Sequence, residues 1–236
     1  MFSFLFFLKR KVVPGFHIKK RDLVVDIGSG DKPFWRADVF LDTLSLGNNQ
    51  RISNSETIHD LGLFFDGDVA NMPFADNVFD FSFCSHLLEH VEDPAVAIKE
   101  IMRVSKSGYI EIPNALIEFI RPFHSHLWFI YNIDGQLIFV RKSKIMHNIC
   151  VKNGKRYHYL NKKINNPFIR FYWKDKIDYK IINDLSEDEF FVVDSANEGN
   201  KTAVHNNLYI IFVKILRYLF YKKKEIIKNY LVKSNF

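Results

Sequence analysis

The chain has 236 residues, of which 47% are hydrophobic, and its net charge is +6. This length suits one sizeable α/β domain with an elaboration, and the apolar content excludes general disorder. The two cysteines, Cys84 and Cys150, form no CxxC pair, so neither a disulfide framework nor a cysteine-based zinc site is indicated, and a reducing cytoplasmic setting is expected. The positive charge favours polyanionic partners such as nucleic acid, anionic lipid or phosphorylated compounds.

Residues 1–21 are expected to form an N-terminal extension. The first eleven, MFSFLFFLKRK, hold an apolar run that is too short to span a bilayer. The charges follow this run rather than precede it, which is the wrong order for a secretory signal. We expect the segment to cap the core, with contact to a membrane surface as the alternative.

Five short apolar runs, each ending at a turn or a polar residue, predict strands of a buried parallel sheet. They lie at 23–27, 37–42, 63–65, 78–84 and 108–112. Between the last two runs, residues 94–104 place apolar side chains at helical spacing, with Pro94 in a favourable first-turn position. Strands joined by such connections predict a Rossmann-like α/β fold, a mostly parallel sheet with flanking helices.

Four polar residues stand at the carboxyl ends of these strands, where sheets of this kind bind ligands. They are Asp26, Asp42, Asp68 and Ser85. Because the carboxyl ends of parallel strands share one edge, we expect these side chains to converge there.

A glycine turn follows the first strand. Gly28 and Gly30 permit a sharp turn and a close approach of the backbone to a ligand. Pro33 stands where a dinucleotide fingerprint needs its third glycine, and no loop ending in Gly-Lys-Ser/Thr is present, so both of those phosphate-binding motifs are excluded. Only about a dozen residues separate Gly30 from Asp42, so a single turn or a loop is expected there instead of a full crossover helix.

In this order and spacing, the motifs resemble those of class I S-adenosylmethionine-dependent methyltransferases, particularly the subgroup with small-molecule acceptors. The matching stretches are VDIGSG at 25–30, Asp42, GDVANMPF at 67–74, NVFDF at 77–81 and SHLLEHV at 85–91. The resemblance implies that residues 22–113 form a cofactor-binding half and residues 114–236 an acceptor-binding half.

The resemblance also implies that S-adenosylmethionine is the cofactor and that the glycine turn holds its methionine end. The residues of this part of the site would be Asp26, Gly28, Ser29 and Gly30.

The later strand ends would hold the nucleoside part of the cofactor. Asp42 would accept hydrogen bonds from both ribose hydroxyls, a task suited to a carboxylate, with Asp38 as the alternative. Asp68 would accept from the exocyclic amine of adenine, with the Val69 amide facing a ring nitrogen. Ser85 would line the pocket near the sulfonium.

Methyl transfer to a hydroxyl acceptor needs a base, and histidines supply most candidates. The catalytic candidates are His86, His90, His124 and His126, with Glu89 as a carboxylate candidate. For Glu89 and His90, stabilising the loop or the pocket wall is the alternative. His124 and His126, if they stand on a strand, share one face, but no third ligand accompanies them, so no metal site is predicted.

The second half carries a hairpin and basic segments. Asp134-Gly135 between two apolar runs predicts a β-hairpin over 126–141. Residues 151–182 are basic and aromatic, a composition that suits base stacking and phosphate contacts as well as ordinary strands. Residues 208–231 predict a basic amphipathic helix, suited to an anionic membrane surface or to core or dimer packing. Two further strands are expected at 168–172 and 179–182.

Together these features predict a methyltransferase that modifies an oxygen or nitrogen of a small-molecule or glycan-type acceptor, such as an envelope precursor. It would work in the cytoplasm, and its basic C-terminal helix leaves peripheral membrane association open as an alternative to core or dimer packing. An RNA methyltransferase and a non-catalytic binding protein with the same fold are the alternatives.

Overall fold

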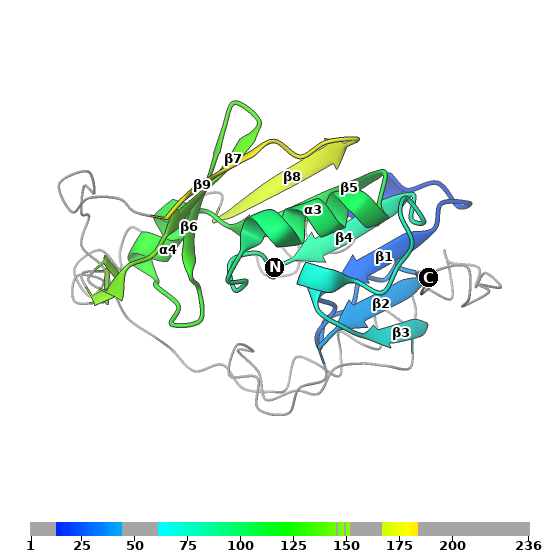
Figure 1. Cartoon of the computed structure of the whole chain (residues 1–236), viewed down its shortest axis with the longest axis horizontal. Helices are drawn as coiled ribbons and strands as arrows, with labels where there is room; N and C mark the ends of the chain where they lie inside the picture. The colour runs from blue at the N-terminus through cyan, green and yellow to red at the C-terminus, as the bar shows by residue number, and fades with distance from the viewer. Residues whose placement is uncertain (1–12, 44–60, 145, 149, 152–166, 184–236) are drawn as a thin grey trace.

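The computed structural model describes residues 13–43, 61–144, 146–148, 150–151 and 167–183 (Figure 1). The expected N-terminal cap over residues 1–11, the basic helix over 208–231 and residues 152–166 of the basic segment lie outside the described residues. In the described part of the chain, no helix is long and apolar enough to cross a membrane.

A six-stranded sheet organises the described structure, in the order β3-β2-β1-β4-β5-β8. The first five strands are parallel, and β8 pairs with β5 in the antiparallel direction. The strands are β1 (Val24–Ile27), β2 (Val39–Asp42), β3 (Leu63–Asp66), β4 (Phe81–Ser85), β5 (Ser107–Pro113) and β8 (Phe168–Lys174). Strand order reverses between β1 and β4, where open α/β sheets bind ligands. The expected Rossmann-like, mostly parallel α/β fold is confirmed.

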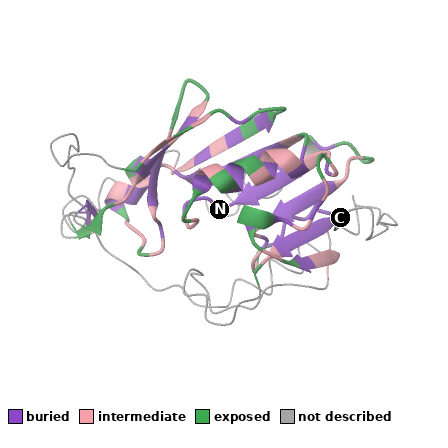
Figure 2. Ribbon diagram, in the orientation of Figure 1, coloured by how far each residue is buried: buried purple, intermediate pink, exposed green. Residues whose placement is uncertain are grey.

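The central strands are buried on both faces, so their sequences are continuously apolar instead of alternating (Figure 2). On one face, Val25 and Ile27 of β1 share a core with the buried side of α3 (Pro94–Val104). On the other face, Phe34 stacks on Phe83 of β4 with ring centroids 4.0 Å apart. Turns occupy the connection between β1 and β2, as its length predicts, and aromatic side chains from this connection cover the sheet where a helix would otherwise lie.

Helix α3 begins and ends at the residues that the sequence predicts. The carboxylate of Asp93 accepts hydrogen bonds from the Ala95 and Val96 amides, at 2.8 and 3.2 Å. Pro94 suits the first turn because it has no backbone N–H that would need an acceptor there. The other helical segments are short: α2 (Val13–Phe16), the 3-10 turn η2 (Val69–Asn71) and α4 (Ala115–Ile120).

A three-stranded sheet, β6-β7-β9, follows in the second half (Figure 1). Its strands are β6 (Trp128–Ile133), β7 (Gln136–Arg141) and β9 (Tyr179–Ile182). The predicted hairpin is present, and its turn residues Asp134 and Gly135 both have positive φ, at 50° and 84°. The Trp128 indole donates to the Val91 carbonyl at 2.8 Å, which ties this sheet to the loop after β4.

Candidate active site

The glycine turn after β1 is fastened to the end of β2. Gly28 and Gly30 have φ of 75° and 53°, a region that favours glycine. The Gly30 amide donates to Asp42 Oδ2 at 2.5 Å, and the Gly28 amide donates to the Leu41 carbonyl at 2.8 Å. Within this turn, the hydroxyl of Ser29 is buried and has no hydrogen-bond partner among the described residues.

The same turn touches the loop after β4. A Cβ built on Gly28 would lie only 3.1 Å from Leu87 Cδ2, so a larger residue here would crowd the Leu87 side chain. The turn therefore sits between the end of β2 and the residue that follows His86, at the switch point of the sheet.

Two other acids hold the backbone near β1. Asp26 is buried and accepts a hydrogen bond from the Phe34 amide at 2.6 Å, which anchors the connection between β1 and β2. Asp38 precedes β2, and its carboxylate accepts from the Val24 amide at 2.9 Å. Asp38 thus lies at the amino end of β2, away from the carboxyl edge, which leaves Asp42 as the candidate for the ribose.

The ends of β2 and β3 are joined directly. The Gly67 amide donates to the Asp42 carbonyl at 3.2 Å, and the Thr43 hydroxyl donates to the Gly67 carbonyl at 3.4 Å. Asp68 follows at once, where its carboxylate caps η2 by accepting from the Ala70 amide at 2.9 Å, while Val69 is buried. Asp42 and Asp68 therefore stand at the ends of adjacent strands, on one edge of the sheet.

His86 occupies the carboxyl end of β4 with a left-handed backbone, φ 58°, which is uncommon for a residue other than glycine. Its Nδ1 lies 3.0 Å from Glu89 Oε1, and its Nε2 lies 3.6 Å from Glu111 Oε1. The His86 side chain is 31% exposed, whereas both carboxylates are fully buried. Ser85 is also turned inward, and its hydroxyl donates to Glu111 Oε1 at 3.4 Å.

The environment shifts the pKa of several groups here. Burial alone would raise the pKa of Glu89, but its hydrogen bond with His86 and the charges of the neighbouring imidazoles outweigh burial and lower it. Burial lowers the pKa of His90, with the negative charge of Glu89 opposing the shift. Burial and the adjacent Glu111 carboxylate raise the pKa of Tyr109, whose hydroxyl donates to Glu111 Oε2 at 3.0 Å.

His124 and His126 do not stand on a strand, so the condition for a shared face is not met. Both precede β6, in a turn and loop, and their rings have different partners. His124 is exposed, and its Nδ1 lies 3.0 Å from His147 Nε2. His126 is buried, and its Nδ1 lies 2.6 Å from Glu118 Oε2. The reason is that residues 124 and 125 form a turn before β6. Side chains two residues apart lie on the same face only in an extended strand, so this spacing does not bring the two rings together.

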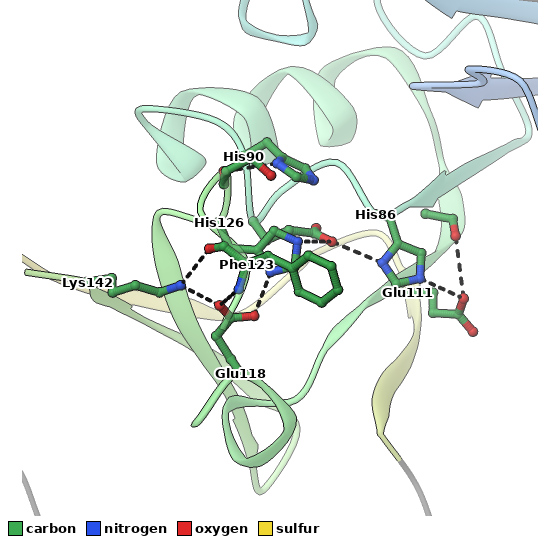
Figure 3. Close-up of polar contacts among 10 residues, drawn as sticks. His86, His90, Glu111, Glu118, Phe123, His126 and Lys142 are labelled. Atoms are coloured by element: carbon green, nitrogen blue, oxygen red, sulfur yellow. Dashed lines mark hydrogen bonds and ion pairs between the residues drawn. The ribbon is translucent and has the colours of Figure 1, made fainter. Parts of the chain in front are cut away.

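Polar contacts extend from the carboxyl edge of β4 into the interior of the second half (Figure 3). Glu118 of α4 binds His126 on one side and the Lys142 ammonium on the other. His126 Nε2 in turn lies 4.0 Å from Glu89 Oε1, which contacts His86. A continuous series of histidine, glutamate and lysine side chains thus connects the partly exposed His86 with buried groups.

Sequence reasoning missed three members of this arrangement: Glu111, Glu118 and Lys142. The two glutamates could have been found in the sequence, because each one interrupts an apolar run in a segment expected to be buried or amphipathic. A carboxylate buried in such a run is rare unless it is paired.

Comparisons with known proteins identify the class that this fold and site define. Residues 41–110 match the sequence model of the family described as a methyltransferase domain. The chain is 33% identical over 111 residues to the demethylmenaquinone methyltransferase of Paenarthrobacter aurescens, a match that covers 42% of this chain and 41% of that protein. The matched part of the chain, residues 41–110, is therefore similar in sequence to a methyltransferase domain. The chain spans about two fifths of the length of this curated relative.

Solved structures of other proteins match part of this chain at low sequence identity. A protein from Pyrococcus horikoshii is 16% identical, with a TM-score of 0.44, over 74% of this chain and 92% of its own. A SAM-dependent methyltransferase from Methanosarcina mazei is 21% identical, with a TM-score of 0.34, over 52% of this chain and 73% of its own.

Proposed function

We propose that this protein is an enzyme that transfers a methyl group from S-adenosylmethionine to an oxygen or nitrogen of a small-molecule acceptor. In this proposal, residues 22–113 hold the cofactor and the second half contributes to the acceptor site. The observation that carries it is the junction of three strand ends: the glycine turn after β1 hydrogen-bonds Asp42 of β2 and packs against the loop after β4 that contains His86.

The residues at this junction fit the cofactor. The buried Ser29 hydroxyl, which has no partner in the described structure, suits a polar group placed against the turn. A carboxylate offers about four lone-pair sites, enough for Asp42 to hold the Gly30 and Thr43 amides together with ribose hydroxyls. Asp68, at the end of the next strand, would then reach the base. S-adenosylmethionine, when bound, supplies the methyl group on its sulfonium.

His86 is the proposed base. The acceptor loses a proton when its oxygen or nitrogen takes the methyl group, and an imidazole is suited to receive it near neutral pH. The ionised Glu89 carboxylate can only accept, so it holds the hydrogen on His86 Nδ1 and leaves Nε2 to take the proton. Glu111 Oε1, 3.6 Å from Nε2, would stabilise the imidazolium that forms. The left-handed backbone of His86 is consistent with a position fixed for function.

A label-transfer experiment tests this function. The full chain is incubated with methyl-tritiated S-adenosylmethionine and with separate small-molecule, RNA and protein fractions from cells. We expect label in the small-molecule fraction, and a fall in kcat of about 10²–10⁴-fold for His86→Gln, the size of a lost general base. His17→Gln, an exposed histidine whose ring contacts Tyr172, is the matched control.

Two outcomes would contradict the proposal. Label in RNA alone would favour the RNA methyltransferase alternative. An unchanged kcat for His86→Gln on a labelled small molecule would remove the histidine from the role of base.

A further inference from the structure

Three potential metal ligands meet where the loop after β4 lies against the loop before β6. Glu89, His90 and His126 each offer one ligand atom, and these atoms all lie within 4.8 Å of one another. The rings of the two histidines are in edge-to-face contact, with centroids 4.7 Å apart. The residues come from two segments, the loop after β4 and the loop before β6, which the Leu127 amide joins by donating to the Glu89 carbonyl at 2.8 Å.

Both imidazoles are oriented as metal-binding imidazoles usually are. His90 Nδ1 lies 3.0 Å from the Ser125 carbonyl, which can only accept, so this nitrogen carries the hydrogen. His126 Nδ1 makes the equivalent contact with the Glu118 carboxylate at 2.6 Å. In each neutral ring, Nε2 then carries the lone pair. A histidine that binds a metal typically donates its other N–H to a carboxylate or a backbone carbonyl in this way.

Glu89 supplies an acceptor oxygen that the fold does not use. One oxygen, Oε1, contacts His86. The side chain is fully buried, yet its other oxygen, Oε2, has no hydrogen-bond partner among the described residues. A buried carboxylate oxygen without a partner is costly, and a bound cation would remove that cost.

We propose that Glu89, His90 and His126 form a binding site for a divalent transition-metal ion of the zinc type. Two imidazoles and one carboxylate are a ligand set found in zinc sites that keep a position open for water or substrate. Calcium and magnesium are less suited because they prefer oxygen ligands. Glu118 supports the site from outside by holding His126, with its own charge compensated by Lys142.

The spacing requires only small movements for binding. Ligand atoms at zinc bond lengths lie about 3.4 Å from one another in a tetrahedral site. The present separations, up to 4.8 Å, close to that value by shifts of the side chains of about 1 Å. His90 is half-buried, which gives an ion access, while Glu89 and His126 are buried.

The site goes beyond the proposed methyl transfer and does not depend on it. Glu89 would bind the ion and orient His86 at the same time, so the two sites share one residue. A metal-binding measurement on the protein alone therefore tests the inference even if no acceptor is ever methylated.

The experiment titrates Zn²⁺ into the chelator-stripped full chain by calorimetry, and repeats the titration with Co²⁺ while recording visible absorption. We expect one high-affinity ion, and a cobalt spectrum of tetrahedral or five-coordinate type. His90→Gln, His126→Gln and Glu89→Gln should each weaken zinc binding by more than about 100-fold, and Glu118→Gln by about 10–100-fold. Circular dichroism checks that each variant is folded. If the buried His126 variant does not fold, half-buried His90→Gln decides.

His124→Gln is the matched control. His124 lies two residues from His126 and pairs with His147, so it is the competing surface site for an added ion. Unchanged high-affinity binding by this variant supports the inference. Loss of binding in His124→Gln but not in His90→Gln, or no zinc binding by the wild type, would overturn it.

Discussion

The buried pair of Lys142 and Glu118 gives a prediction whose size follows from the structure. Their side chains are 3% and 1% exposed, so Lys142→Met removes the ammonium from a carboxylate that water cannot reach. Breaking a buried ion pair from one side costs about 3–5 kcal/mol. The lower end applies here, because Glu118 keeps hydrogen bonds from the Phe123 amide, at 2.9 Å, and with His126.

We therefore expect Lys142→Met to lower the free energy of unfolding by about 3 kcal/mol. For a chain of this size that corresponds to a fall in Tm of about 6–12 °C. Methionine has a side chain of similar length without the charge, and the ammonium that it removes also lies over the Phe129 ring, 5.4 Å from its centroid, so the loss reports on the charge more than on packing. Urea denaturation followed by circular dichroism measures it.

Two variants make the test decisive. Lys144→Met removes an exposed lysine nearby and should change stability by less than about 0.5 kcal/mol. The double variant Lys142→Met/Glu118→Gln should be less destabilised than the sum of its single variants, because no unpaired buried charge remains. A loss below about 1 kcal/mol for Lys142→Met, or strict additivity, would refute the reasoning.

Three further predictions follow from single contacts. Gly28→Ala should destabilise the fold by about 1–2 kcal/mol in urea denaturation, because its φ is 75° and the new methyl group would crowd Leu87; a neutral result would contradict the turn geometry. Asp93→Ala should cost about 1 kcal/mol through loss of the α3 cap, and an unchanged Tm would argue against that cap. His90, whose pKa is lowered in the fold, contributes stability that is present above its ordinary pKa of about 6.5 and is lost as the pH falls. Between pH 7.5 and 5.5 with chelator present, the Tm of the wild type should therefore fall more than that of His90→Gln, and equal falls would contradict the shift.

Features set by neighbouring residues were predictable from the sequence. Helix α3 is an example, because Asp93, Pro94 and the apolar spacing all act within a few residues. The glycine turn and the helix-free connection after it were predictable for the same reason: positive φ and chain length are local properties. The hairpin at Asp134-Gly135 also depends on two residues only.

The candidate site required information that no local pattern holds. His126 meets Glu118 across the end of α4, and it meets Glu89 across the link between the loop after β4 and the loop before β6. The sequence pattern predicted that the hairpin begins at His126, whereas β6 begins only at Trp128. The antiparallel pairing of β8 with β5 is likewise a long-range contact, which the apolar run at 168–172 predicts as a strand but not as a neighbour.

The central claim is that the strand ends around Gly30 and Asp42 hold S-adenosylmethionine. Calorimetric titration of the cofactor into the full chain tests it most directly, with Asp178→Ala, an exposed acid beside β9, as the control. We predict binding by the wild type and by the control. Loss of two hydrogen bonds to a charged carboxylate, at about 1.5–3 kcal/mol each, should weaken binding by Asp42→Ala about 10²–10⁴-fold. No binding by the wild type, or equal affinities for Asp42→Ala and Asp178→Ala, would contradict the account.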